Sequence, residues 1–371
     1  MEHRFTEKIK EILNSHFGEA SESVYENSQL LQYLNLKTKS AERGSKARGS
    51  FANLYAIYVL VEDYIKKGFI ESSNYSTEYE GARFTDLLSR AKELPFGSGL
   101  QNHALNNRVN DEFKGAFPYS DPVPIVRNRE TRRYWMHENL LKVKVGNDTF
   151  NISQAIVEII DEYIKTKQDA FQRFIDACEE LQKIENESPQ NVEEFILSLL
   201  APNVDARLFE LVSYAILKFY YHDRKIFWGF EIENLTEENL KLYKTGRTNA
   251  NDGGIDFVMK PLGRFFQVTE TLDFKKYFLD IDKIEKYPVT FVIKSEESAE
   301  NLYRKLKENA SKSYAVEAIV EKYMSCIEEL INIPALTERF RESIKQGYLK
   351  SILNEIITQS KVEFNYPDDE E

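Results

Sequence analysis

The order of apolar patterns between about residues 200 and 300 constrains the fold more than any other feature of the chain. The segment "DARLFELVSYAILKFYY" repeats apolar residues at three- and four-residue spacing, which predicts a helix. Strand-like alternation follows in "KIFWGFEIENLTEENLKLYKTGRT", "GGIDFVM" and "RFFQVTET". The helical "LDFKKYFLDIDKIE" and the apolar run "PVTFVI" complete the set. The sequence therefore predicts a mixed α+β core in the order αβββαβ.

Helical patterns dominate the chain on both sides of this core. Apolar spacing predicts helices in 1–35 and 50–70, in the long amphipathic stretch "QAIVEIIDEYIKTKQDAFQRFIDACEELQKIE", and in the last 70 residues. Alternation around Gly-Asn-Asp in "NLLKVKVGNDTFNIS" predicts a hairpin. We expect four regions, namely a helical, loop-rich DNA-recognition region (1–150), a helical connector (151–200), the core (201–300) and C-terminal helices with a possible dimer interface (301–371).

Composition excludes several classes of protein. The 371 residues are 42% hydrophobic and 30% charged, which is typical of a soluble globular protein. No run approaches 18 uncharged apolar residues, so neither a membrane span nor a secretory signal is expected and the cytoplasm is the expected compartment. Cys178 and Cys326 lie inside helical patterns without CxxC spacing, which argues against a disulfide framework or a zinc site.

The net charge of −12 conceals an uneven distribution along the chain. Between Leu36 and Trp135 there are 16 Lys and Arg against 12 Asp and Glu, a local charge of +4 that leaves −16 for the remainder. An acidic protein still binds DNA when its basic residues converge on one face. The charge therefore does not exclude a nucleic-acid partner.

An aspartate stands where a buried strand is expected to begin. Asp256 follows a Gly-Gly pair that lets other groups approach closely, and Glu210 is a lone acid on the preceding helical pattern. Facing carboxylates near strand ends suit Mg²⁺, which prefers oxygen ligands. Gln267 follows on the next strand, where alternation places it on one face with Phe265 and Thr269.

Each of these residues also has an ordinary structural interpretation. Asp256 could cap the Gly-Gly bend, as aspartates beside glycines commonly do. Glu210 could be a solvated helix residue, and Gln267 a buried strand glutamine whose hydrogen bonds are met by backbone. His103, His137 and His222 show no ligand spacing, so a histidine metal site is not expected.

These residues resemble a known family. A helix carrying Glu210, the "DGGID" segment and a strand with Gln267 at its centre resemble the PD-(D/E)xK nuclease superfamily, in particular its Mrr-like and type II restriction endonuclease members. The similarity covers roughly residues 203 to 295, about a quarter of the chain. It implies that Asp256 and Glu210 hold the metal and that Gln267 opens the third-strand motif.

The chain departs from the family's pattern at one position. Two residues after Gln267, where the family usually has lysine, stands Thr269, whose hydroxyl cannot supply positive charge. Lys275 or Lys276, at the start of the next helix, could supply it instead. Glu270 is a further acid, which alternation points away from Gln267. A relocated lysine and a weakened or inactive site both remain possible.

Three polar segments could contact DNA. The Asn-rich stretch "QNHALNNRVN" could reach base edges or could equally form helix caps, and the arginines of "RNRETRRYW" and "RGSKARGS" could hold phosphates or form solvated surface and linker. Arg247 and Asn249, shortly before the Gly-Gly pair, are further candidates. The DNA-contact candidates are Arg43, Lys46, Arg48, Gln101, Asn102, His103, Asn106, Asn107, Arg108, Arg127, Arg129, Arg132, Arg133, Arg247 and Asn249.

The function these features favour is Mg²⁺-dependent, site-specific cleavage of double-stranded DNA, as in a type II restriction endonuclease. Cutting both strands normally requires two active sites, so a homodimer without membrane attachment is expected. One alternative is a DNA-binding protein that keeps the nuclease fold without the chemistry. Another is a helical scaffold for protein partners, consistent with the acidic remainder of the chain.

Overall fold

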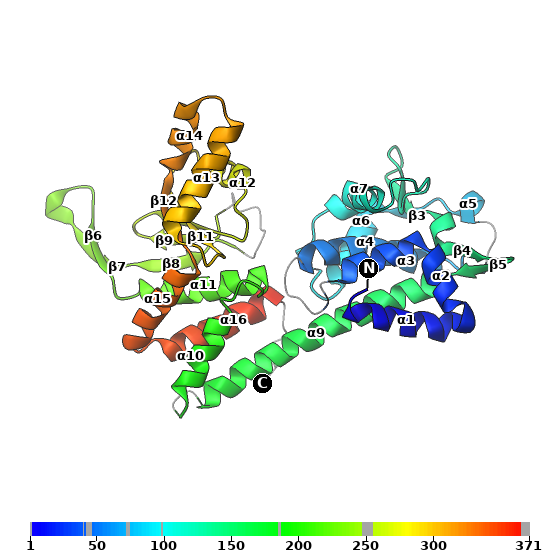
Figure 1. Cartoon of the computed structure of the whole chain (residues 1–371), viewed down its shortest axis with the longest axis horizontal. Coiled ribbons are helices and arrows are strands. Elements are labelled where there is room, and N and C mark those ends of the chain that lie inside the picture. Colours follow the sequence, from blue (N-terminus) through cyan, green and yellow to red (C-terminus); the bar gives the residue numbers. More distant parts are fainter. Residues whose placement is uncertain are drawn as a thin grey trace. The chain divides into compact units, whose positions relative to one another are not determined.

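The computed structural model consists of two compact units, Met1–Arg173 and Phe174–Glu371 (Figure 1). The boundary falls inside one long helix, α9 (Ser153–Ile184). The structure describes residues 2–39, 41, 47–71, 75–97, 99–184, 187–246 and 255–364. Among these residues, no helix combines the length and the apolar character needed to cross a membrane.

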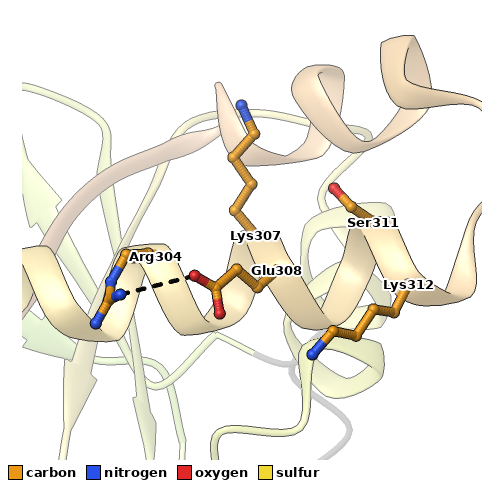
Figure 2. A pocket seen from close by; sticks show the side chains of 5 residues that line it. All are labelled: Arg304, Lys307, Glu308, Ser311 and Lys312. Carbon is orange, nitrogen blue, oxygen red and sulfur yellow. Dashed lines mark ion pairs between the residues drawn. The ribbon is translucent and has the colours of Figure 1, made fainter.

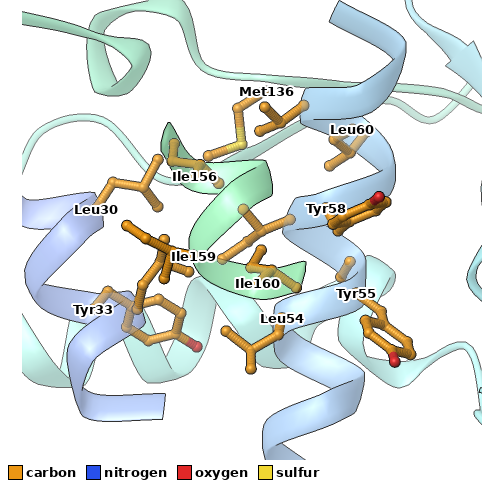
Figure 3. Packing of buried hydrophobic residues seen from close by; sticks show 14 of the residues in the cluster. Leu30, Tyr33, Leu54, Tyr55, Tyr58, Leu60, Met136, Ile156, Ile159 and Ile160 are labelled. Carbon is orange, nitrogen blue, oxygen red and sulfur yellow. The ribbon is translucent and has the colours of Figure 1, made fainter. Parts of the chain in front are cut away.

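The first unit is mainly helical. Its helices α3, α4 and α9 place Tyr33, Leu54 and Ile160 in a shared apolar core (Figure 3). The amphipathic spacing of α9 explains this packing, because its apolar stripe buries Ile156 and Ile159 while charged residues stay outside. Its helices are α1 (Arg4–Phe17), η1 (Gly18–Ala20), α2 (Ser21–Asn27), α3 (Gln29–Thr38), α4 (Ala47–Lys66), α5 (Tyr75–Glu78), α6 (Phe84–Glu93), the π-helical η2 (Ala104–Arg108), α7 (Val109–Ala116), α8 (Glu138–Leu141) and α9.

Two small antiparallel sheets complete this unit. One has the strand order β1-β3-β2, and the other is the expected hairpin β4-β5, whose turn residue Gly146 takes φ +61°. The segment between 71 and 135, expected to be rich in loops, thus contains strands and helices α6 and α7. The strands are β1 (Ala82–Arg83), β2 (Ile125–Asn128), β3 (Arg133–Met136), β4 (Lys142–Val145) and β5 (Asp148–Asn151).

The second unit is built around a five-stranded mixed sheet in the order β12-β11-β10-β9-β8. Strands β8, β9 and β10 form an antiparallel meander, whereas β11 runs parallel to β10 and therefore needs a crossover, which α12 supplies. The strands are β8 (Lys241–Lys244), β9 (Phe257–Lys260), β10 (Arg264–Thr269), β11 (Val289–Ile293) and β12 (Ile327–Ile331). A separate hairpin pairs β6 (Lys225–Trp228) with β7 (Thr236–Asn239) around η3 (Ile232–Asn234).

Helices cover both faces of this sheet (Figure 1). Phe266 and Val292 point into a core made with α11, α15 and α16, whereas Phe291 and Ile293 point into a second core made with α12 and α13. We call these the α11 face and the α12 face. The helices are α10 (Pro189–Ser198), α11 (Ala206–Tyr220), α12 (Phe274–Lys283), α13 (Ala299–Ser313), α14 (Glu317–Met324), α15 (Ile333–Lys345) and α16 (Leu349–Phe364).

The protein is thus mixed α+β, and elements α11, β8, β9, β10, α12 and β11 follow the order αβββαβ. The C-terminal region differs from the expectation of helices alone. In "YAVEAIVEKYMSCIEELI" the helix ends at Met324, Cys326 lies in the turn, and β12 follows because its apolar residues Leu330 and Ile331 complete the sheet. Since β12, α15 and α16 build the same cores as 201–300, the chain has two units where the sequence suggested four regions.

Candidate functional site at one end of the sheet

Asp256 lies immediately before β9 and is tied to β10 by two hydrogen bonds and to Thr245, just after β8, by a third. Its amide donates to the Phe266 carbonyl at 3.0 Å, and its Oδ2 accepts from the Val268 amide at 2.6 Å. On the other side, its carbonyl accepts from the Thr245 amide at 3.0 Å. The half-buried carboxylate is therefore held at one end of the sheet, between β8 and β10.

Gln267 lies between Phe266 and Val268, the two residues of β10 that bind Asp256. Gln267 and Asp256 therefore lie side by side. Its side chain is 8% exposed, and alternation with Phe265 puts it on the α12 face, as expected. The Oε1 atom is buried and has no hydrogen-bond partner among the described residues. A buried amide oxygen without a partner is costly, typically about 1–3 kcal/mol, which makes this oxygen beside Asp256 a candidate ligand.

Thr269 lies on the same face and is 3% exposed. The Nζ atom of Lys276 on α12 donates to its Oγ1 at 3.4 Å. Lys275 is exposed, and its backbone amide donates to the capping Asp273 carboxylate at 3.1 Å. Of the two lysines suggested by the sequence, the structure brings Lys276 to Thr269.

Glu210 lies on the opposite, α11 face. It is 5% exposed, and its Oε1 is 3.2 Å from Lys244 Nζ at the end of β8. The buried Glu363 of α16 is 3.9 Å from the same ammonium. Lys244 pairs across the sheet with Phe257, the residue after Asp256, so Glu210 approaches the same end of the sheet from the other face. The solvated-helix interpretation of Glu210 is wrong, because the residue is buried in an ion pair.

Glu270 and Lys294 form a second ion pair on the α11 face. Lys294 Nζ is 2.6 Å from Glu270 Oε1, and it also donates to the Val204 carbonyl just before α11. The lysine side chain is 2% exposed and the glutamate side chain 38% exposed. As expected, alternation along β10 directs Glu270 away from Gln267.

Sequence reasoning missed Lys244, Lys294 and Glu363. A lysine at the end of a strand was the available signal for the first two, since Lys244 is the last residue of β8 and Lys294 directly follows the apolar β11, and a buried lysine needs an acid. Glu363 carries no comparable signal. It stands near the end of an amphipathic helix, and only the packing of α16 on α11 makes it buried.

The Asn-rich stretch in the first unit forms the start of η2 and its approach. Gln101, Asn102, His103 and Asn107 are exposed. Asn106 has a structural role instead, because its carbonyl accepts from Arg127 Nη1 at 2.5 Å and its Oδ1 from the Tyr134 hydroxyl at 3.0 Å. These bonds join η2 to the β2–β3 hairpin.

The arginines of the β2–β3 hairpin divide into two kinds. Arg129 and Arg132 are exposed at the turn and have no described partner. Arg133 donates to the Gly81 carbonyl at 2.8 Å, which fastens β3 to β1, and Arg127 is committed to η2. Arg108 pairs with Glu112 at 2.9 Å along its own helix. The exposed members form a polar and basic surface, which we call the η2–hairpin surface, made of Gln101, Asn102, His103, Asn107, Arg129 and Arg132.

Several expected DNA contacts cannot be placed. Arg43, Lys46, Arg247 and Asn249 lie outside the described residues, as do Gly253 and Gly254. Arg48 belongs to α4, but its side chain lies outside the described part of the chain.

A surface hollow of about 370 Å³ lies along α13 (Figure 2). All of its lining residues come from that one helix, and Arg304 is paired with Glu308 at 3.8 Å. None of the expected site residues lines it, so the hollow is separate from the sheet end. Its lining residues are Arg304, Lys307, Glu308, Ser311 and Lys312.

Within the described residues, no group of three or more His, Cys, Asp or Glu side chains is arranged to hold a metal ion. No protein-family model, curated protein or solved structure matches the chain. The function is therefore argued from the site itself.

Proposed function

We propose that the protein is a Mg²⁺-dependent endonuclease acting on double-stranded DNA, in the manner of PD-(D/E)xK type II restriction enzymes. One observation carries the proposal. At the same end of the αβββαβ sheet, a fixed carboxylate, a buried amide oxygen without a described partner and a lysine come together, in Asp256, Gln267 and Lys276. These groups match the metal ligands and the positive charge that phosphodiester hydrolysis requires.

The residues present fit a hard divalent cation. Asp256 supplies a carboxylate and Gln267 an amide oxygen that lacks a described hydrogen-bond donor. Mg²⁺ commonly binds through one or two protein oxygens and keeps several waters, so a three-acid cluster is not required. When bound, Mg²⁺ supplies charge stabilisation at the phosphate and lowers the pKa of a water. Glu210, which the sequence suggested as a second ligand, is engaged by Lys244 on the other face.

Lys276 takes the place of the missing strand lysine in this proposal. Its ammonium has no carboxylate partner among the described residues, so its charge is available to a phosphate or to the attacking water. The Thr269 hydroxyl orients the ammonium, since the two atoms are 3.4 Å apart. Lysine on a flexible stem suits such a role because its point charge can be delivered from a neighbouring element.

The η2–hairpin surface is the proposed contact to DNA in the first unit. Arg129 and Arg132 can contact phosphates, while the exposed amides of Gln101, Asn102 and Asn107 match the donor and acceptor pattern of base edges. Asn106 and Arg127 are excluded from base reading, because their polar groups hold η2 against the hairpin.

A plasmid-cleavage assay tests the proposal. Supercoiled plasmids and genomic DNA are incubated with the full chain in Mg²⁺ and in EDTA, and Asp256→Asn is compared with wild type. We expect Mg²⁺-dependent linear products from wild type and a loss on the order of 10³-fold in Asp256→Asn. DNA binding in Ca²⁺ should be unchanged in the variant. Cleavage that survives in Asp256→Asn, or that proceeds in EDTA, would contradict the proposal.

A DNA-binding protein without catalytic activity is the second candidate. The threonine at position 269 favours this candidate, because its hydroxyl contributes no charge at the position where the nuclease family has lysine. The hydroxyl is also only 3% exposed. Salt-dependent DNA binding without cleavage of any DNA tested, in Mg²⁺ or Mn²⁺, would support this function over the endonuclease.

A further inference from the structure

The β6–β7 hairpin exposes large apolar side chains. Figure 1 shows it extending away from the sheet of the second unit. Phe230 is 101% exposed and Ile232 85%, while Phe227 on β6 is 66% exposed. Trp228 and Leu235 add to the same surface at 40% and 49%. Soluble proteins rarely expose so many large apolar groups together unless a partner covers them.

The hairpin is a built element rather than a loose loop. Ile226 packs against the core of the α11 face, which anchors its base. At its tip the chain turns so tightly that a Cβ on Gly229 would lie 2.7 Å from the Asn234 carbonyl oxygen. Lys225 and Glu237 join the two strands at 2.5 Å. An exposed element held in shape in this way presents a defined surface.

We propose that this arm is the dimer interface, where β6 pairs with β6 of a second copy of the chain. Each strand of the two-stranded arm has one free backbone edge. The β7 edge carries Glu237 and Glu238, which would face like charges in a self-pairing. The β6 edge carries Ile226, Phe227 and Trp228 and lacks such protection. Self-pairing through β6 closes with two-fold symmetry, as an isologous dimer must.

The charge of the arm argues against DNA as its partner, and its apolar area supports a second copy. From Lys225 to Asn239 the arm has one lysine and four glutamates, a net charge of −3 that phosphates would repel. Its five exposed apolar side chains offer roughly 600 Å² per arm, at about 150–250 Å² for a fully exposed aromatic side chain. With the added strand pairing this approaches the about 800 Å² per partner of a standard interface.

This location differs from the C-terminal interface that the sequence suggested. The apolar residues of α15 and α16, among them Phe340, Leu353 and Ile356, are already buried against α11. Little of their apolar surface remains for a partner. The arm carries the most exposed large apolar side chains among the described residues of the second unit, since Phe230 is 101% and Ile232 85% exposed whereas Tyr287, outside the arm, reaches 59%.

Molecular mass in solution tests the arm interface without any reference to cleavage. At about 10 μM, light scattering should give twice the 43.4 kDa of the chain for wild type. The double variant Phe227→Glu, Trp228→Glu should give a monomer, because it places four charges along the two paired β6 strands. Tyr119→Glu, at a 98% exposed position of the first unit, is the matched control and should remain dimeric.

Cross-linking gives a second measurement that does not depend on a destabilised variant. A cysteine in the middle of β6, made by Phe227→Cys, should yield covalent dimers with a short bifunctional thiol reagent, because the two-fold axis brings both copies of this residue together, whereas Tyr119→Cys should not. The native Cys178 and Cys326 are buried and should stay silent.

Two results would overturn the arm dimer, namely a monomeric wild type and a double variant that remains dimeric. If the wild type is monomeric and the double variant also binds DNA more weakly, the arm is assigned to nucleic acid. A dimer of a protein that cleaves no DNA would uphold the interface and count only against the endonuclease proposal.

Discussion

The two faces of the second unit's sheet differ in how their buried charged and amide groups are paired. On the α11 face, Lys244 binds Glu210 and Glu363, and Lys294 is held by Glu270 and a backbone carbonyl, so that only the small hydroxyls of Ser213 and Ser360 lack a partner among the described buried side chains of α11 and α16. On the α12 face, Gln267 keeps a buried oxygen without a described partner. Polar groups that satisfy one another stabilise a fold, whereas an unsatisfied buried group indicates a place where a ligand completes the structure.

This difference reassigns the roles of the acids. Glu210 is the helix acid that the family resemblance implies as a ligand, but its oxygen is occupied by the lysine of β8. Gln267 is uncharged, yet its amide oxygen lies beside Asp256 and has no hydrogen-bond partner among the described residues. If this division holds, side chains of the α12 face control cleavage and side chains of the α11 face control stability.

Among the variants that compare the two faces, the largest effect is expected from removing the lysine of the α12 face. Lys276→Ala should lower the cleavage rate by about 10²-fold or more, because the ammonium beside Thr269 would no longer act on the phosphate or the water. The matched control is Lys275→Ala, one residue earlier on the same helix, exposed, with a side chain that makes no described contact. It should cleave like wild type in a single-turnover assay.

Moving the lysine back to the strand sharpens this prediction. In the Lys276→Ala background, Thr269→Lys should restore part of the rate, since it places an ammonium on β10 beside Gln267. Equal losses in Lys275→Ala and Lys276→Ala would instead indicate a general effect of charge on DNA binding.

The next effect concerns stability on the α11 face. Lys244→Met should lower the free energy of unfolding by about 3–5 kcal/mol, because it leaves Glu210 and Glu363 buried without their cation. Lys241→Met, at an exposed position of the same strand, should change it by less than about 0.5 kcal/mol. Urea denaturation followed by circular dichroism measures both.

A double change tests whether this ion cluster is only structural. Adding Glu210→Gln to Lys244→Met should recover part of the lost stability, and the folded double variant should still cleave DNA. If Glu210→Gln alone abolished cleavage without lowering stability, Glu210 would be a ligand after all and the division between the faces would fail.

Local patterns predicted the elements of the core better than their contacts. The alternation in "RFFQVTET" placed Phe265, Gln267 and Thr269 on one face, as the structure has them, because strand geometry fixes side-chain direction by parity. The same parity could not say which helix covers that face. The pairing of Glu210 with Lys244 depends on how α11 crosses β8, which no local pattern encodes.

The C-terminal region shows the same limit of sequence reasoning. A helical spacing that ran past Met324 concealed β12, since a five-residue segment such as "IEELI" fits either structure. Its place beside β11 is decided by the long-range pairing of Val292 with Ile331. For the same reason the dimer surface was sought in helices that prove to be covered, whereas the exposed arm appeared only as weak strand alternation.

The smallest expected effect on the free energy of unfolding comes from removing one buried tyrosine hydroxyl on either face. Burial raises the pKa of Tyr214, on the α11 face, to about 12 from its usual 10, and burial together with Asp280 also raises the pKa of Tyr277 on the α12 face. Their hydroxyls donate to the Leu242 carbonyl at 3.2 Å and to the Thr271 carbonyl at 3.0 Å. At neutral pH, Tyr214→Phe or Tyr277→Phe should each cost about 1 kcal/mol through the lost hydrogen bond.

The pH dependence of these two variants tests how closed each face is. A phenol whose folded pKa is raised keeps its proton where the unfolded chain loses it, so its contribution to stability is complete below pH 10 and declines as the pH rises through 12. Denaturation midpoints measured from pH 9 to pH 11.5 should therefore fall less steeply in either variant than in wild type. If only Tyr214→Phe flattened the curve, Tyr277 would be accessible to water, and the α12 face would open at the position where Thr269 and Lys276 meet.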